Sequence, residues 1–590
     1  MKPEEQTSPG LKKILQKWTR ELLLLDNSLL VVAAILGFLA GLASTVFRWM
    51  IDFVDLIFSQ ESLIDLGVSP AFIPYLTPLI PMFGGGLIGL ICYYFPSAVK
   101  ENGVHKVMEA VALNNGKIHS HTIASAAVTS AITIGSGGSA GREGPTVQIG
   151  SAIGSFFGRA LNVSTERIRV LVGCGAAAGI AASFNAPIAG VLFAMEIILG
   201  DFTIHTFSPI VIASVIGTVT GRALEGNEVT FDVPVHELVS QFEIIFYLLL
   251  GGLCGLVSKL FTWAYFKSGD FFSEQSKISS LLTPALGGLL VGIISIFVPE
   301  VLGNGYEAME KALNGQMFWG LAFALVFMKI IATSITLGSG GMGGVFAPSL
   351  FIGAMAGTAF GSLVHGVFPQ WTASPETYAV VGMGAVAGAV MQAPLTNILM
   401  LFELTNDYTL ILPIMATCIV SAYVFRELAK HSIYIQYLLR KGIKIKNGRE
   451  VSILNAIRVQ DVMTNEVTPI PEEMPFKKIL ETISYSKMIY FPVIDRLGNM
   501  TGILSFSNIR EVFFEEGLDD LIVARDLATR EVQYLMPHQN LNEAMELFAR
   551  LDVEQLPVAR SNDPQKAVGM ISRADVVAAY NREILTRRVQ

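Results

Sequence analysis

The sequence predicts an all-α polytopic membrane domain with an internal repeat, followed by a soluble α/β pair. The composition is the first reason: 52% of the 590 residues are hydrophobic and 15% are charged, whereas about 25% are charged in an average soluble domain. The second reason is distribution, because apolar segments follow one another from about residue 28 to about residue 439. The net charge of −8 is mild and implies no nucleic-acid partner.

The apolar segments are short and interrupted by Gly and Pro clusters. They cover residues 29–58, 72–95, 123–134, 148–161, 188–199, 208–224, 242–266, 281–298, 318–337, 349–368, 378–390 and 410–425. Several are shorter than the roughly 20 residues that a straight spanning helix needs. In lipid, such interruptions are tolerated only where they are buried in protein or line a polar cavity. We therefore expect short or broken helices around an internal site.

A glycine- and proline-containing pattern occurs twice. Residues 135–154 and 338–357 share Gly-Ser-Gly-Gly followed by Gly, Pro, Ile-Gly and Gly at the same spacing, and residues 172–196 correspond to 381–403. Matching interrupted segments in two halves indicate a transport site at their interface. From these residues alone, the repeats could run parallel or inverted.

Polar and basic stretches limit the membrane region. We expect residues 1–28 to form a cytosolic amphipathic helix, residues 29–440 the membrane domain, residues 441–458 a basic linker, and residues 459–590 the soluble pair. The positive-inside rule places both termini in the cytoplasm. The expected location is a bacterial inner or plasma membrane.

Helix N-termini offer what a small anion needs. They present free backbone N–H groups and about half a positive charge, and they do not hold the ion as tightly as a full charge would. Candidate sites are Asn102-Gly103, residues 141–145 and residues 343–348, each opening a predicted helix, together with the late Tyr434, whose hydroxyl can donate to an ion.

These motifs resemble the CLC family of chloride channels and chloride/proton antiporters over about residues 28–440. The matching runs are Gly-Arg-Glu-Gly-Pro (141–145), Gly-Gly-Val-Phe-Ala-Pro (343–348) and Ser-Phe-Asn-Ala-Pro (183–187), with the late Tyr434. The resemblance implies an inverted repeat, a pore in each subunit and a homodimer in lipid. The expected anion-binding residues are Asn102, Gly103, Arg142, Gly144, Val345, Phe346 and Tyr434.

Glu143 is the residue expected to gate transport, and the resemblance assigns it the same role. A carboxylate at a helix N-terminus mimics an anion and competes with chloride for one position. Protonation removes that competition, so acid should open the path. An isolated glutamate in a membrane is costly and is usually functional. The alternative is a structural ion pair between Glu143 and Arg142.

Two departures from the family pattern keep the mechanism open. Asn102 and His105 replace the serine and proline that family members usually carry, so selectivity among chloride, nitrate and other small anions is open. Ile197 stands where many antiporters carry a second glutamate that receives protons, whereas Glu196 and Glu403 are expected to be structural, packed or at helix ends. Chloride/proton antiport is the expected function, and a passive voltage- or pH-gated chloride channel is the alternative.

The soluble region contains two similar copies, at about 459–515 and 523–590, and resembles tandem CBS domains. Such pairs commonly bind adenine nucleotides. Ser572 and Asp575 match the position that often contacts the ribose, whereas the first copy carries Asn508 in place of the aspartate. The alternative is a structural dimerisation module without a ligand.

Other classes are less compatible with the sequence. No motif of an intramembrane enzyme occurs, no metal site is expected, and no cofactor is required for transport. A CBS-containing divalent-cation channel is a distant alternative. It would need more carboxylates in the apolar region than Glu143, Glu196 and Glu403.

Overall fold

The computed structural model describes residues 28–58, 64, 69, 72, 76–95, 103–226, 231, 239–274, 281–443, 445–446, 449–450, 454, 457–484, 486, 488–512, 521–530, 532–551, 553–560 and 563–589. The predicted N-terminal amphipathic helix and Asn102 lie outside these residues. Contacts divide the chain into two compact units near Gly442.

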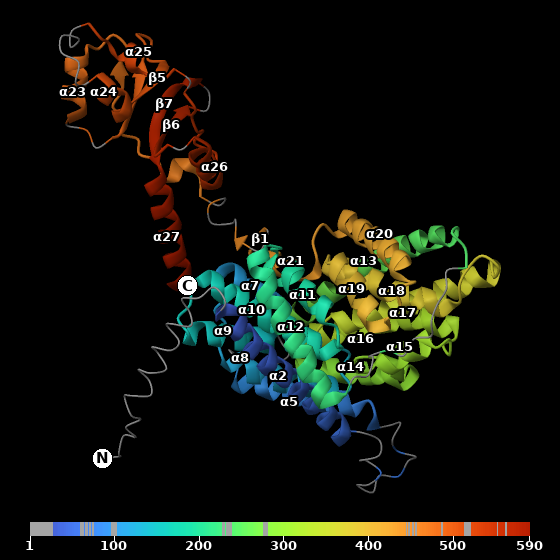
Figure 1. Cartoon of the computed structure of the whole chain (residues 1–590). Helices are drawn as coiled ribbons and strands as arrows, with labels where there is room; N and C mark the ends of the chain where they lie inside the picture. Colours follow the sequence, from blue (N-terminus) through green and yellow to red (C-terminus); the bar gives the residue numbers. More distant parts are fainter. Residues whose placement is uncertain are drawn as a thin grey trace, which may run out of the picture. The chain divides into compact units, whose positions relative to one another are not determined.

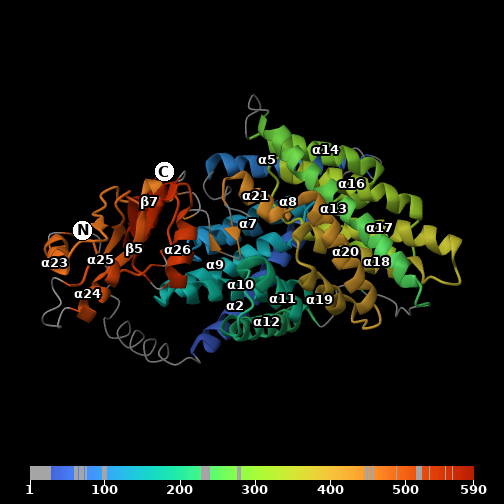
Figure 2. The ribbon, with the colours of Figure 1, turned by 90° about the horizontal axis from the view of Figure 1, so that it is seen from above.

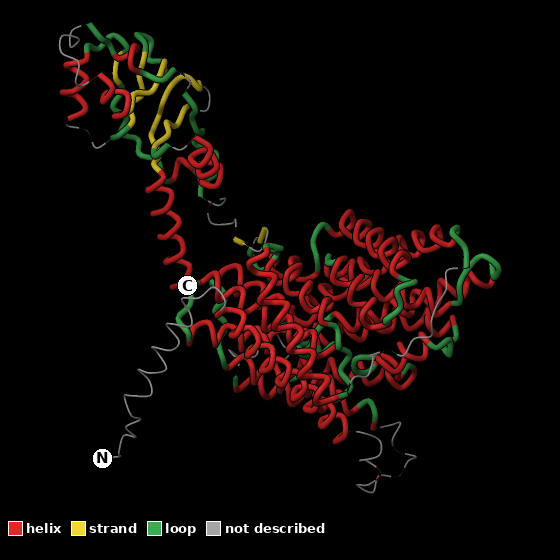
Figure 3. Tube along the Cα trace, viewed as in Figure 1, coloured by secondary structure: helices red, strands yellow, loops and turns green. Residues whose placement is uncertain are grey.

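The described part of the first unit consists of helices (Figures 1 and 3). Its first half contains α2 (Ser28–Phe58), α5 (Leu79–Tyr94), α7 (Val104–Leu113), α8 (His121–Gly135), α9 (Glu143–Ala160), α10 (Thr165–Phe184), α11 (Pro187–Phe193), the π-helix η2 (Ala194–Leu199) and α12 (Ile204–Glu225). Its second half contains α13 (Glu243–Glu274), α14 (Thr283–Phe297), the 3-10 helix η3 (Pro299–Val301), α15 (Tyr306–Leu313), α16 (Trp319–Gly338), α17 (Phe346–Val367), α18 (Pro375–Met391), α19 (Pro394–Thr405), α20 (Ile411–Ala429) and α21 (Ile433–Arg440).

The helix lengths agree with the expectation of short and broken segments. Seven helices among the described residues are long and apolar enough to cross a membrane, while others, such as α5 and α14, have 10–17 residues. The spanning segment of α10 is 83% buried inside the protein, whereas that of α2 is 39% buried. Helices such as α10 therefore form an internal layer, and helices such as α2 form the outer surface of a multi-pass membrane protein.

Glycines let helices cross closely in both halves, and Gly150 and Gly353 hold equivalent positions in the repeat. α9 crosses α10 where Gly150 lies against Gly175, and α17 crosses α18 where Gly353 lies against Gly382. A Cβ atom on any of these glycines would collide with the backbone of the opposite helix. Small residues at such crossings let helices pack in lipid, where no hydrophobic force drives them together. The two halves therefore use the same packing.

α21 connects the end of the second half to the start of the first. It packs against α7 and also contacts α18, and Figures 1 and 2 show α21 beside α7. Ser432 caps α21 by accepting the backbone N–H of Ile435 at 3.3 Å. This packing brings Tyr434 back to the helix starts of the first half.

The second unit contains two α/β copies. The first has β3 (Ile470–Pro471), α23 (Phe476–Ser484), β4 (Tyr490–Ile494), β5 (Met500–Ser505) and α24 (Phe506–Val512); the second has α25 (Ala524–Leu527), α26 (Leu541–Leu551), β6 (Gln555–Arg560), β7 (Asp563–Ser572) and α27 (Arg573–Val589), and a short hairpin of β1 (Ile445–Lys446) and β2 (Arg449–Glu450) precedes both. β4 runs parallel to β3 and antiparallel to β5. In the second copy, β6 pairs antiparallel with β7, and Leu535 forms a parallel bridge with Val558.

The copies exchange their opening segments. Val459 belongs to the core of the second copy with Leu541 and Phe548, and Thr464 pairs with Met570. Conversely, Ala524 completes the core of the first copy, and two backbone hydrogen bonds of 2.9 Å join residues 503 and 529. The core of each copy is therefore completed by residues from the N-terminal end of the other copy.

Candidate functional site

Two helix starts from opposite halves are joined by their backbones. The N–H of Gly141 donates to the carbonyl of Gly344 at 2.8 Å, and the N–H of Gly344 donates to the carbonyl of Gly141 at 2.6 Å. These glycines hold equivalent positions in the repeat, so the reciprocal contact is that of a local two-fold axis. The N-termini of α9 and α17 consequently meet at one point.

A second reciprocal pair fixes the loops that lead to these helices. The N–H of Ser139 donates to Thr336 Oγ1 at 3.1 Å, and the N–H of Met342 donates to Thr133 Oγ1 at 2.9 Å. Each threonine side chain thus satisfies a buried amide of the other half. The repeat predicted by the sequence therefore produces a rigid junction with the positive ends of two helices at its centre.

Glu143 is the first residue of α9 and lies at this junction. Its side chain is 1% exposed, and neither carboxylate oxygen has a hydrogen-bond partner among the described residues. A Cβ atom on Gly344 would lie 3.0 Å from Glu143 Oε2, which places the carboxylate against the start of α17. A charged side chain in the membrane interior costs about 3 kcal/mol on insertion scales. Each helix N-terminus can return up to about 2 kcal/mol, so two of them can hold an anionic group here.

Arg142 does not form the structural ion pair that was the alternative for Glu143. Its guanidinium donates to the carbonyl of Ser183 at 2.8 Å. The guanidinium carbon also lies 5.8 Å from the centre of the Phe184 ring and 5.4 Å from that of Tyr306. Arg142 is therefore held by a carbonyl and by aromatic rings, and the Glu143 carboxylate remains without a partner.

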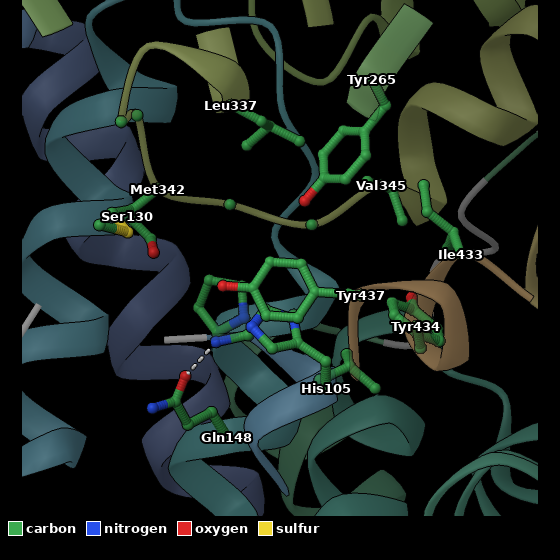
Figure 4. A pocket seen from close by; sticks show the side chains of 18 of the residues that line it. His105, Ser130, Gln148, Tyr265, Leu337, Met342, Val345, Ile433, Tyr434 and Tyr437 are labelled. Carbon is green, nitrogen blue, oxygen red and sulfur yellow. Dashed lines mark hydrogen bonds between the residues drawn. The ribbon is translucent and has the colours of Figure 1, made fainter. Parts of the chain in front are cut away.

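A cavity of about 340 Å³ is lined by Gly144, the neighbour of Glu143 in the chain, and Figure 4 shows this cavity. Four residues that the sequence predicted to bind anions line it: Gly103, Gly144, Val345 and Tyr434. Phe346, also predicted, begins α17 but is 1% exposed and packs edge-on against Phe184 at 5.5 Å between ring centres. Phe346 does not line this cavity, so the predicted contact of its backbone amide with an anion stays a prediction.

The cavity wall also includes Gln148, Tyr437 of α21 and Lys441, which directly follows α21, and the sequence did not predict these residues. Gln148 Oε1 accepts the N–H of Gly103 at 2.7 Å (Figure 4), so the protein already uses that amide. The His105 ring lies against the Tyr437 ring at 3.8 Å between ring centres, with the two planes tilted by 39°, and Lys441 Nζ lies 4.6 Å from the Tyr437 ring centre. Gln148 could have been noticed as a polar residue one turn into a glycine-rich apolar helix.

A second cavity of about 280 Å³ lies on the Arg142 side of Glu143. Its wall includes Arg48, Arg142, Arg222, Glu225 and Tyr306. Gly144 lines the first cavity and Arg142 the second, so the two residues that flank Glu143 in the chain line different cavities. A side chain in this position can separate or connect the two spaces.

Glu196 and Glu403 act as reciprocal helix caps. Glu403 accepts the N–H groups of Ile188 at 2.9 Å and Ala189 at 2.7 Å, at the start of α11. Glu196 accepts the N–H of Thr396 at 2.8 Å and its hydroxyl at 2.6 Å, at the start of α19. Both carboxylates are therefore at helix ends, as expected. The neighbouring Ile197 is buried and apolar.

In the soluble unit, Ser572 and Asp575 form a cap at the start of α27. Asp575 Oδ2 accepts the Ser572 hydroxyl at 2.5 Å and the Ser572 N–H at 3.0 Å. Ser505 and Asn508 make the same contacts at the start of α24. The nucleotide site at Ser572 and Asp575 stays a prediction, and the cap fixes the orientation of one carboxylate oxygen.

Comparisons with known proteins agree with this architecture. The family model described as voltage gated chloride channel matches residues 84–426, more than half of the chain. The chain belongs to this family. The CBS domain model matches residues 459–515 and 524–582, so the predicted CBS pair is also confirmed.

Similar proteins include bacterial transporters. A putative chloride channel protein ClcB-like from Ralstonia nicotianae is 38% identical over 61% of this chain and 85% of its own length. An H(+)/Cl(-) exchange transporter ClcA from Vibrio campbellii is 30% identical over 74% of this chain and 93% of its own length. The crystal structure of a slow cyanobacterial Cl-/H+ antiporter matches with a TM-score of 0.65 and 28% identity, covering 70% of this chain and 97% of that one. These matches support anion transport as the general activity.

Proposed function

We propose that this protein exchanges chloride for protons across a membrane, with Glu143 as the gate. The observation that carries the proposal is the buried Glu143 carboxylate, which has no hydrogen-bond partner within the described part of the chain and lies where two helix N-termini meet. The named activities of the bacterial exchange transporters among its relatives support it.

The geometry suggests how one side chain could couple two ions. The ionised carboxylate occupies the positive junction and excludes chloride, because both are anions that need the same helix ends. A proton neutralises the carboxyl group and weakens its hold on the junction. Chloride can then pass between the cavity lined by Tyr434 and the cavity lined by Arg142.

A passive chloride channel is the second candidate, and the environment of Glu196 favours it. Antiport needs a proton route from the Tyr434 side to Glu143, but Ile197 cannot titrate. Glu196 is tied to the start of α19 by its bonds to Thr396. It is therefore poorly suited to replace the missing glutamate, and a water chain would have to carry protons in an exchanger.

Two further proposals concern the rest of the protein. By resemblance, we infer a homodimer with a pore in each subunit and both termini in the cytoplasm. We also propose that adenine nucleotide binds the CBS pair near Asp575 and that transport requires no cofactor.

The test is simultaneous recording of chloride efflux and external pH in liposomes containing the purified protein. We expect the wild-type protein to move protons against their gradient when chloride runs down its own. Glu143→Gln should still conduct chloride, but proton movement should fall to background and the pH dependence of chloride flux should disappear.

Glu166→Gln is a matched control, since Glu166 lies in the first turn of α10 but is exposed. It should behave like the wild type. Unchanged proton movement in Glu143→Gln would remove the gate assignment. Chloride flux without uphill proton movement in the wild type would replace exchange with the channel.

A further inference from the structure

Tyr306 lies at the junction of two cavities. It is the first residue of α15 and lines the 280 Å³ cavity beside Arg142. It also lines a third cavity of about 590 Å³, bounded by α2, η3 and α15. Among the residues that the structure describes, Tyr306 alone belongs to both linings. A side chain that separates two spaces in this way can conduct between them.

The two cavities carry opposite charge. The smaller one contains Arg48, Arg142 and Arg222 against a single carboxylate, Glu225, which pairs with Arg48 at 2.6 Å. Such an excess of positive charge attracts chloride.

The larger cavity is lined by acidic side chains: Asp52 and Asp55 from α2, Glu300 from η3 and Glu307 from α15, with Lys311 as the one cation of its lining. Asp55 experiences the repulsion of both Asp52 and Glu307. Carboxylates grouped in this way repel chloride and concentrate protons.

The Tyr306 hydroxyl is a buried donor beside buried acceptors. It has no hydrogen bond of good geometry, and neither have the two Glu143 oxygens, yet Tyr306 and Glu143 interact electrostatically. Arg142 lies over the Tyr306 ring at 5.4 Å, and Phe231 packs against it edge-on at 5.7 Å. The ring is thus held by packing while the hydroxyl remains available. The equivalent residue in the first half is Val104, so the fold does not require a hydroxyl here.

We propose that Tyr306 relays protons from the acid-lined cavity to Glu143, while chloride approaches the same gate through the arginine-lined cavity. The proposal rests on the chloride/proton exchange proposed above. In the step, the Tyr306 O–H bond breaks as its proton passes to a Glu143 oxygen. A hydronium ion held by the acid-lined cavity simultaneously gives a proton to the phenol oxygen and is left as water. The phenol is regenerated, Glu143 becomes neutral, and the hydronium ion becomes neutral water, so Glu143 is the one protein group in the step whose charge changes.

The test compares Tyr306→Phe with Tyr378→Phe in the same liposome assay. Tyr378, on α18, carries another buried hydroxyl without a partner and lines neither cavity. Loss of a positioned proton donor should lower the ratio of proton to chloride movement at least about tenfold in Tyr306→Phe. Tyr378→Phe should keep the wild-type ratio. A role in packing alone would not lower that ratio, because phenylalanine keeps the ring.

A second set of variants tests whether the charges that line the two cavities affect proton and chloride movement. The double variant Asp52→Asn with Glu307→Gln should lower proton movement more than chloride movement, and Arg222→Gln should do the reverse. A wild-type ratio in both Tyr306→Phe and the double variant would overturn the relay but leave exchange intact. Absence of uphill proton movement in the wild type would overturn exchange and the relay together.

Discussion

The starts of α9 and α17 have the same backbone but different side chains. Reciprocal hydrogen bonds between Gly141 and Gly344 make their helix ends equivalent. The residue that begins α9 is Glu143, whereas Phe346 begins α17 at the matching position. The backbone symmetry thus supplies positive potential from both halves, and the proposed gate is the one carboxylate that the repeat places in a single half.

Glu196 and Glu403 show the opposite case. They also occupy equivalent positions, but both halves carry the glutamate, and each caps a helix of the other half. Because the repeat has this carboxylate in both halves, its role is one that both halves share, namely capping a helix of the other half. Asymmetry within the repeat is therefore a better guide to function here than the presence of a charge.

The largest effect on chloride flux should come from breaking the reciprocal hydrogen bonds between Gly141 and Gly344. In Gly344→Ala, the new Cβ would lie 2.9 Å from the N of Gly144 and 3.0 Å from Glu143 Oε2. The helix starts must then separate, so chloride flux in liposomes should fall at least about tenfold, as expected when a binding geometry shifts by about an ångström. Gly366→Ala, in the same helix with no atom within 4 Å of its Cβ, is the control. Equal flux in both variants would show that the bridge is dispensable.

An intermediate effect is expected from the symmetric glutamates. Glu196→Gln and Glu403→Gln should each lower the free energy of unfolding by about 1–3 kcal/mol, since glutamine offers one accepting oxygen in place of two and removes the charge that strengthens these hydrogen bonds. The two losses should be similar, and the proton-to-chloride ratio should stay at the wild-type value in both. Thermal unfolding and the flux assay measure these quantities. A change of the ratio in Glu196→Gln alone would give this residue a role in proton transfer.

The smallest effect concerns the two CBS copies. Asp575→Ala and Asn508→Ala both remove a helix cap worth about 1 kcal/mol, so they form a matched pair. Saturating adenine nucleotide at about 100 times its Kd should stabilise the full chain by about 2.7 kcal/mol. That stabilisation should be lost in Asp575→Ala and kept in Asn508→Ala. If nucleotide stabilises neither the two variants nor the wild type, the two CBS copies form a structural module without a nucleotide ligand.

Local signals predicted the helix starts but not the contacts between them. Glycine and proline placed the starts of α9 and α17 correctly, because these residues act on the backbone nearest to them. The Gly141–Gly344 bridge joins residues about two hundred positions apart, and the sequence of neither loop predicts this contact. Tyr306 was missed for the same reason: its neighbours Arg142 and Glu143 come from the other half. Asn102 lies outside the described residues, so its predicted role is untested.

The exchange of segments between the CBS copies has a consequence for synthesis on the ribosome. Val459 leaves the ribosome before every other member of its core cluster, which extends to Val576. The apolar side chains near residue 459 therefore stay exposed while the ribosome synthesises more than a hundred further residues. Chains that wait in this way are prone to aggregate. A premature stop after residue 529 would leave the core of the second copy incomplete, and Val459 would then have no core to pack into.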